Sequence, residues 1–147
     1  MEIIFVCTGN TCRSPMAEVL LKEALKRRGV EDVEVSSAGV SAQADQPASH
    51  NAVQAMKEMG LNLKDHRARP LDEVDLSGAL ALCMTDKHVL LTQLIKPGAD
   101  ARLLGEYAGV GGEIPDPYGG SIDQYRKTAR ALHDAAEKIA ERILTEI

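Results

Sequence analysis

Two hydrophobic patterns alternate along the chain. Short apolar runs, some of them strictly alternating, predict strands over residues 1–6, 33–37, 79–84 and 100–104. Apolar residues at helical spacing predict helices over residues 15–28, 52–59, 86–96 and 122–143. This order is typical of the α/β class, so residues 1–147 are predicted to form a single domain. We expect a short parallel sheet of about four strands with helices on both faces.

Residue types at the segment ends support these limits. Gly29 follows the first helical pattern, at a position where a left-handed backbone ends many helices. Thr85 is a suitable N-cap for the third helix, and Ser121 with Gln124 forms a capping box for the last. Residues 111–120 are so rich in glycine and proline that they predict a loop.

The segment that joins the first strand to the first helix has the composition of a phosphate-binding loop. It reads CTGNTCRSP over residues 7–15, and Pro15 suits the first turn of a helix. A tight turn here directs backbone N–H groups toward one point, in front of the positive end of the helix dipole. Ligands bind open α/β sheets at this end of the strands. The predicted phosphate-binding residues are Thr8, Gly9, Asn10, Thr11, Cys12 and Ser14.

Cys7 and Arg13 are the candidate nucleophile and its cationic partner. A thiol at a helix N-terminus beside an arginine has a lowered pKa, so we expect Cys7 to be a thiolate near neutral pH. The guanidinium of Arg13 can bind two phosphoryl oxygens, and the hydroxyl of Ser14 can donate to the sulfur. The alternative is a buried structural cysteine followed by a surface arginine. The strand before the loop and the helix after it favour the catalytic interpretation.

Asp116 is the candidate acid. Cleavage of a phosphoryl bond requires a proton for the leaving group, and the same residue can then activate water as a base. The position of Asp116 in a Gly/Pro-rich loop suits this role, although an aspartate before Pro117 is equally typical of a turn. Glu113 and Asp123 are the fallback acids.

Composition and charge exclude several other classes. The net charge of −5 argues against a nucleic-acid partner, and no segment predicts a membrane span or a signal peptide. Three cysteines without a secretion signal indicate reduced thiols, and the four histidines lack the spacing of metal ligands. We therefore expect a cytoplasmic monomer without a metal or other cofactor.

Residues 7–15 resemble the phosphate-binding loop of the low-molecular-weight protein tyrosine phosphatase family, especially its bacterial protein-arginine phosphatase branch. Further matching segments follow in the family's order, at residues 36–39, 66–69, 82–84, 103–105 and 116–118. The resemblance implies a metal-free phosphatase that acts on phosphorylated proteins through a phosphocysteine on Cys7. It also implies that Asp116 is the acid, and that Ser37 and His66 hold the side chain of Asn10.

The substrate pocket departs from the tyrosine phosphatase pattern. Residues 40–47 contain no aromatic side chain, and Thr11 stands where that family usually has a bulky aliphatic residue. Tyr118 alone is placed as an aromatic wall. These departures resemble the arginine phosphatases, so we predict phosphoarginine as the substrate group and phosphotyrosine as the alternative. Asp116 would then also attract the guanidinium cation.

Cys12 has two possible roles, as a space-filling residue or as a resolving thiol for oxidised Cys7. Cys83 is predicted to be a core residue. Two other functions stay open for the whole chain. An arsenate reductase needs further reactive cysteines, and none follows Cys83. A phosphocarrier holds phosphate on cysteine but has no use for an acid that hydrolyses it.

Overall fold

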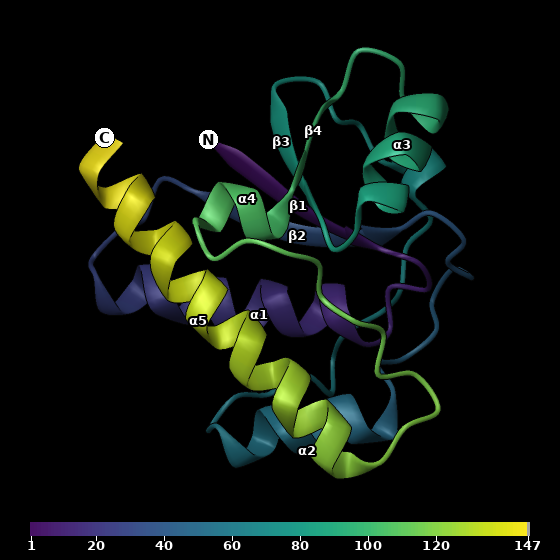
Figure 1. Cartoon of the computed structure of the whole chain (residues 1–147), viewed down its shortest axis with the longest axis vertical. Coiled ribbons are helices and arrows are strands. Elements are labelled where there is room, and N and C mark those ends of the chain that lie inside the picture. Colours follow the sequence, from purple (N-terminus) through teal and green to yellow (C-terminus); the bar gives the residue numbers. More distant parts are fainter. Residues whose placement is uncertain (147) are drawn as a thin grey trace.

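The predicted strands form one parallel sheet in the computed structural model, which describes residues 1–146. The sheet order is β2-β1-β3-β4, and every neighbouring pair is parallel (Figure 1). The bounds are Glu2–Cys7 for β1, Glu34–Gly39 for β2, Ala79–Cys83 for β3 and Asp100–Leu103 for β4. Because β1 pairs on both sides, the loop that follows it emerges near the middle of the sheet edge.

Helices cover both faces of this sheet, as expected (Figure 1). Alternate residues of β1 point to opposite faces: Ile3 and Phe5 join a core formed with α1 and α5, whereas Ile4 and Val6 pack toward α3. The helices are α1 (Arg13–Arg27), α2 (His50–Glu58), α3 (Asp86–Ile95), α4 (Leu104–Ala108) and α5 (Ile122–Glu146), with a short 3-10 turn at Leu71–Glu73. Both cores are apolar, which anchors the ends of β1 and α1 that carry the loop.

The helix ends agree with their sequence signals. The hydroxyl of Thr85 caps α3 by accepting the N–H of His88. Ser121 and Gln124 form the reciprocal bonds of a capping box before α5. Gly29 lies after α1 at a positive φ of 71°.

Two short elements were not predicted, and the predicted limits of the other helices and strands differ from the observed ones by up to three residues. The strand predicted to reach Leu104 ends at Leu103, and the chain turns at once into α4. Neither α4 nor the 3-10 turn at Leu71–Glu73 is long enough to show a hydrophobic period. In α4, Gly105 lies so close to the Gly112 carbonyl that a Cβ would approach its oxygen to 2.1 Å. A tertiary contact therefore places this element.

The end of β2 lies against the loop after β1, and Gly39 makes this approach possible. A Cβ on Gly39 would lie 2.5 Å from the carbonyl oxygen of Thr8 and 2.9 Å from the nitrogen of Asn10. Both atoms belong to the backbone, so neither can move aside as a flexible side chain would. The packing of β2 on the loop thus requires a residue without a side chain.

We expect Gly39→Ala to destabilise the fold by about 1–3 kcal/mol, the usual cost of overpacking. The matched control is Gly9→Ala in the same loop, where a Cβ would meet only the Thr11 hydroxyl at 3.7 Å. Urea unfolding of both variants measures the difference. Equal stabilities for the two variants would show that the contact at Gly39 does not restrict side-chain size.

Candidate active site

The loop between β1 and α1 is held by hydrogen bonds from three separate parts of the chain. Asn10 adopts a left-handed backbone with φ of 56°, a conformation that asparagine tolerates better than most residues. Its side-chain nitrogen donates to Ser14 Oγ at 2.8 Å and to Ser37 Oγ at 2.9 Å. Its side-chain oxygen accepts the N–H of Arg69 at 2.9 Å. The loop is therefore tied to α1, to β2 and to the segment before the 3-10 turn.

His66 also contacts Asn10, but not in the way that the resemblance implied. Its Nε2 lies 2.6 Å from the main-chain carbonyl oxygen of Asn10, whereas Ser37, Ser14 and Arg69 hold the side chain. The main-chain amide of Arg69 takes the place expected for the histidine. His66 therefore supports the backbone of the loop.

Cys7 is buried at the base of this loop. Its Sγ lies 2.8 Å from Ser14 Oγ. Burial raises the pKa of the Cys7 thiol, while hydrogen bonds from Ser14, the charge of Arg13 and a backbone bond from Asn10 lower it. The expected lowered pKa is therefore wrong, because sequence patterns show the helix end and the arginine but not how completely the sulfur is removed from water.

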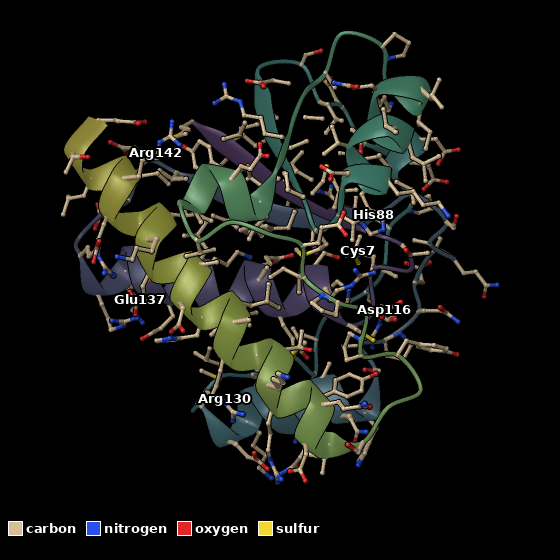
Figure 2. The ribbon with its side chains drawn as sticks, in the orientation of Figure 1. Cys7, His88, Asp116, Arg130, Glu137 and Arg142 are labelled. Atoms are coloured by element: carbon tan, nitrogen blue, oxygen red, sulfur yellow. The ribbon has the colours of Figure 1, made fainter. Side chains whose placement is uncertain are left out.

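Arg13 and Asp116 lie together beside the thiol. Arg13 is buried, and its Nη1 donates to the carbonyl oxygen of Ile114 at 2.9 Å. Its Nη2 lies 3.6 Å from Oδ2 of Asp116, whose side chain is 50% exposed. The other oxygen of Asp116 accepts the N–H of Tyr118. The aspartate therefore also stabilises a turn, which was the alternative role predicted for it. Figure 2 shows Cys7 and Asp116 on the same side of the molecule.

A cavity of about 310 Å³ opens above the sulfur. Eleven residues line it, and they include the thiol, the guanidinium and the carboxylate: Cys7, Thr8, Gly9, Thr11, Cys12, Arg13, Ser41, Gln43, Gln46, Asp116 and Tyr118. Most of the predicted site residues are therefore brought together. The buried side chains of Asn10 and Ser14 lie outside this lining and bond each other, so they support the loop, and their contact with substrate stays a prediction.

The fallback acids lie elsewhere. Glu113 accepts the N–H of Asp86, and Asp123 pairs with Arg126 on the exposed side of α5. A larger cavity of about 560 Å³ lies at the opposite, amino-terminal end of the strands, and the described residues that line it include no cysteine or arginine. Within residues 1–146, His, Cys, Asp and Glu side chains form no group of three that could hold a metal ion.

A thiol, a guanidinium and a carboxylate around one small cavity are the groups that phosphoryl transfer to sulfur requires. The family model for low molecular weight phosphotyrosine protein phosphatases matches residues 2–147. The chain belongs to this family. It is accordingly a metal-independent phosphoprotein phosphatase of the cysteine-based type. No helix in the described part of this phosphatase combines the length and apolar character needed to cross a membrane.

Its relatives carry two different names. The chain is 42% identical to a protein-arginine-phosphatase of Bacillus subtilis, with 97% of each chain covered. It is also 42% identical to the low molecular weight protein-tyrosine-phosphatase PtpB of Staphylococcus haemolyticus, with 90% of this chain and 92% of that one covered. A solved YwlE arginine phosphatase, a cysteine-to-serine mutant with a phosphorylated active-site serine, superposes with a TM-score of 0.93 at 39% identity, over 99% of this chain and 97% of that one.

Sequence reasoning missed five polar residues of this phosphatase. Ser41, Gln43 and Gln46 line the cavity from a segment that has no periodic pattern. His88 on α3 lies 2.8 Å from the Thr8 hydroxyl, and Tyr125 on α5 lies 3.3 Å from Cys12 Sγ. In the sequence, Tyr125 lies within the helical periodicity that predicts α5 and is not distinguished from its apolar neighbours. A buried phenol needs a polar partner, and this requirement was the available signal.

Cys12 points toward α5. Its sulfur contacts the hydroxyl of Ser49 at 3.4 Å as well as that of Tyr125, and both Cys12 and Tyr125 are buried. Burial first, and its hydrogen bond with Cys12 second, raise the pKa of Tyr125 to about 12. The role of Cys12 as a resolving thiol for Cys7 stays a prediction. Cys83 lies in the core on β3, as expected.

The hydrogen bond between Ser14 and Cys7 predicts a pH effect. It lowers the pKa of the thiol, so Ser14→Ala should raise that pKa and reduce the thiolate fraction at any given pH. Alkylation of Cys7 by iodoacetamide, followed by mass spectrometry across a pH series, should therefore shift to higher pH.

Ser37→Ala is the matched control for this experiment, because the Ser37 hydroxyl bonds Asn10 and Glu18 rather than the sulfur. We expect its alkylation profile to match that of the wild type. An unshifted profile in Ser14→Ala would mean that this hydroxyl does not stabilise the thiolate.

Proposed function

We propose that the protein removes phosphate from phosphoarginine in proteins through a phosphocysteine on Cys7. The observation that carries this proposal is the cavity itself. The sulfur lies at its base, Arg13 and Asp116 lie beside it, and its outer wall contains polar side chains with one aromatic residue. This composition suits a charged, planar substrate group on a phosphate.

In the first step, Cys7 gives its proton to solvent and the thiolate attacks phosphorus. The S–P bond forms as the P–N bond to the guanidinium breaks, and Asp116 gives a proton to the leaving nitrogen. Arg13 and the backbone N–H groups of the loop stabilise the charge on the phosphoryl oxygens. The 3.6 Å approach of Asp116 to Arg13 supports the proposal that acid and cation act on the same phosphoryl group.

In the second step, water replaces the sulfur. Asp116 now takes a proton from water, the oxygen attacks phosphorus, and the S–P bond breaks to return the thiolate. The hydroxyl of Ser14, 2.8 Å from Sγ, stabilises the sulfur as it leaves. The relative with a phosphorylated active-site serine supports an intermediate on the residue at this position. This step also distinguishes the protein from a phosphocarrier.

The cavity wall supports arginine over tyrosine as the phosphorylated residue. Thr11, Gln43 and Gln46 offer hydroxyl and amide oxygens that can accept from a guanidinium, and the Asp116 carboxylate attracts its charge. The Bacillus subtilis relative is named for this activity. The second candidate is phosphotyrosine, which is favoured by Tyr118 at the rim, 77% exposed, and by the name of the Staphylococcus haemolyticus relative.

The role of Asp116 predicts a dependence on the leaving group. Asp116→Asn should slow hydrolysis of aryl phosphates with poor leaving groups by on the order of 100-fold, because those groups need a proton as the bond breaks. Good leaving groups should be affected far less. The measurement is kcat/KM across a series of aryl phosphates of different leaving-group pKa.

Glu113→Gln and Asp123→Asn are the matched controls, because both carboxylates bond groups away from the cavity. Both should keep the leaving-group dependence of the wild type. If Asp116→Asn keeps it too, Asp116 is not the acid.

The proposed substrate predicts a change of preference at Thr11. Thr11→Ile removes a hydroxyl that a guanidinium can use and adds apolar surface that suits a ring. Transition-state binding of phosphoarginine should weaken by about 1–3 kcal/mol. Transition-state binding of phosphotyrosine should stay the same or become stronger. The measurement is kcat/KM for matched peptides that carry each phosphorylated residue.

Thr11→Ser, which keeps the hydroxyl, should retain the preference for phosphoarginine. Cys7→Ser should be inactive on both peptides, because an alcohol there is not ionised at neutral pH. A wild-type preference for phosphotyrosine would overturn the arginine assignment and leave the cysteine mechanism in place. A ratio that Thr11→Ile does not move would direct attention to Tyr118.

A further inference from the structure

His88 is a buried histidine beside the active site with no part in the mechanism described so far. It lies in the first turn of α3, and its side chain reaches toward the loop after β1 (Figure 2). Its Nε2 lies 2.8 Å from the hydroxyl oxygen of Thr8. Its Nδ1 lies 3.0 Å from the hydroxyl oxygen of Thr85, the N-cap of the same helix. Both ring nitrogens are thus engaged by threonine hydroxyls.

The charge state of the ring follows from its surroundings. The pKa of His88 is lowered to about 4, chiefly by burial and also by the charges of Arg13 and Lys87, while the charges of Asp116 and Glu113 oppose this shift. At neutral pH the ring is therefore uncharged and carries a single N–H. That proton is carried either by Nδ1, which faces Thr85, or by Nε2, which faces Thr8.

The cap at Thr85 favours one of these arrangements. The oxygen of Thr85 already accepts the backbone N–H of His88 at 3.3 Å. Its own hydroxyl proton is free to be donated to Nδ1, which places the ring proton on Nε2. Nε2–H then donates to the Thr8 oxygen. The hydroxyl proton of Thr8, which lines the cavity, is left for another acceptor.

We propose that His88 is a positioning residue that holds Thr8 so that its hydroxyl donates to a phosphoryl oxygen in the cavity. The inference rests on the proposed phosphoryl transfer at Cys7, but not on which amino acid carries the phosphate. A neutral ring suits this role, because it fixes the hydroxyl without adding a second positive charge beside Arg13. The alternative is that His88 only packs and caps α3.

Two amide substitutions separate these roles. The amide nitrogen of glutamine can occupy the place of Nε2, whereas that of asparagine matches Nδ1 and ends short of Thr8. We expect His88→Gln to keep kcat for para-nitrophenyl phosphate within a few-fold of wild type, and His88→Asn to lower it by on the order of tenfold. The asparagine variant should also bind inorganic vanadate more weakly. Equal losses in the two variants would overturn the proposal.

A double-mutant cycle with Thr8 tests the connection directly. Thr8→Val removes the hydroxyl and keeps the shape of the side chain, and Thr8→Ser is its control with the hydroxyl retained. If His88 acts through Thr8, adding His88→Asn to Thr8→Val should cause little further loss of kcat. Losses that simply multiply would show that His88 acts independently of Thr8, which would overturn the proposal.

The position of the ring proton gives a readout that does not depend on activity. The ¹⁵N chemical shifts of the His88 ring at neutral pH should show protonation at Nε2, and protonation at Nδ1 would contradict the inference. Hydrolysis by the wild type and inactivity of Cys7→Ser test the cysteine mechanism separately. A failure of that mechanism can therefore be told apart from a failure of this inference.

Discussion

The hydrogen bonds to the side chain of Asn10 are the interaction on which the active-site loop depends. One residue supplies both the left-handed backbone that turns the loop and the amide that joins it to Ser14, Ser37 and Arg69. Glycine could adopt the same φ but could not make these bonds. The same amide bonds the hydroxyl of Ser14, so this anchor also positions the contact of Ser14 with Cys7. A buried amide with all its groups paired also resists rearrangement.

The burial of Cys7 has two opposed effects. Removal from water strengthens the hydrogen bonds and the electrostatic interactions that act on a bound phosphoryl group. The same removal raises the pKa of the thiol, against the effects of Ser14 and Arg13. The site therefore stabilises the charge of a bound phosphoryl group more strongly than it stabilises the charge of the free thiolate.

Much of this structure could be predicted from the sequence, because local patterns determine it. Alternating apolar residues predicted the sheet, and the order of Cys7 and Arg13 between a strand and a helix predicted the loop. The rest depends on contacts between distant segments. His88 reaches Thr8 from α3, and Tyr125 reaches Cys12 from α5, so neither partner is visible in the other's local sequence. The prediction of a lowered pKa for Cys7 was wrong for the same reason, because the burial of the sulfur depends on the whole fold.

The bond from Arg13 to the carbonyl of Ile114 joins the first loop of the chain to one near its end. The thiol and the guanidinium are synthesised early, whereas the proposed acid is placed only when the segment between α4 and α5 has docked. Because a domain generally folds as a unit, the site can be completed only after this segment has been synthesised. A nascent or shortened chain therefore holds the nucleophile without the acid, so phosphatase activity reports that the whole chain has folded.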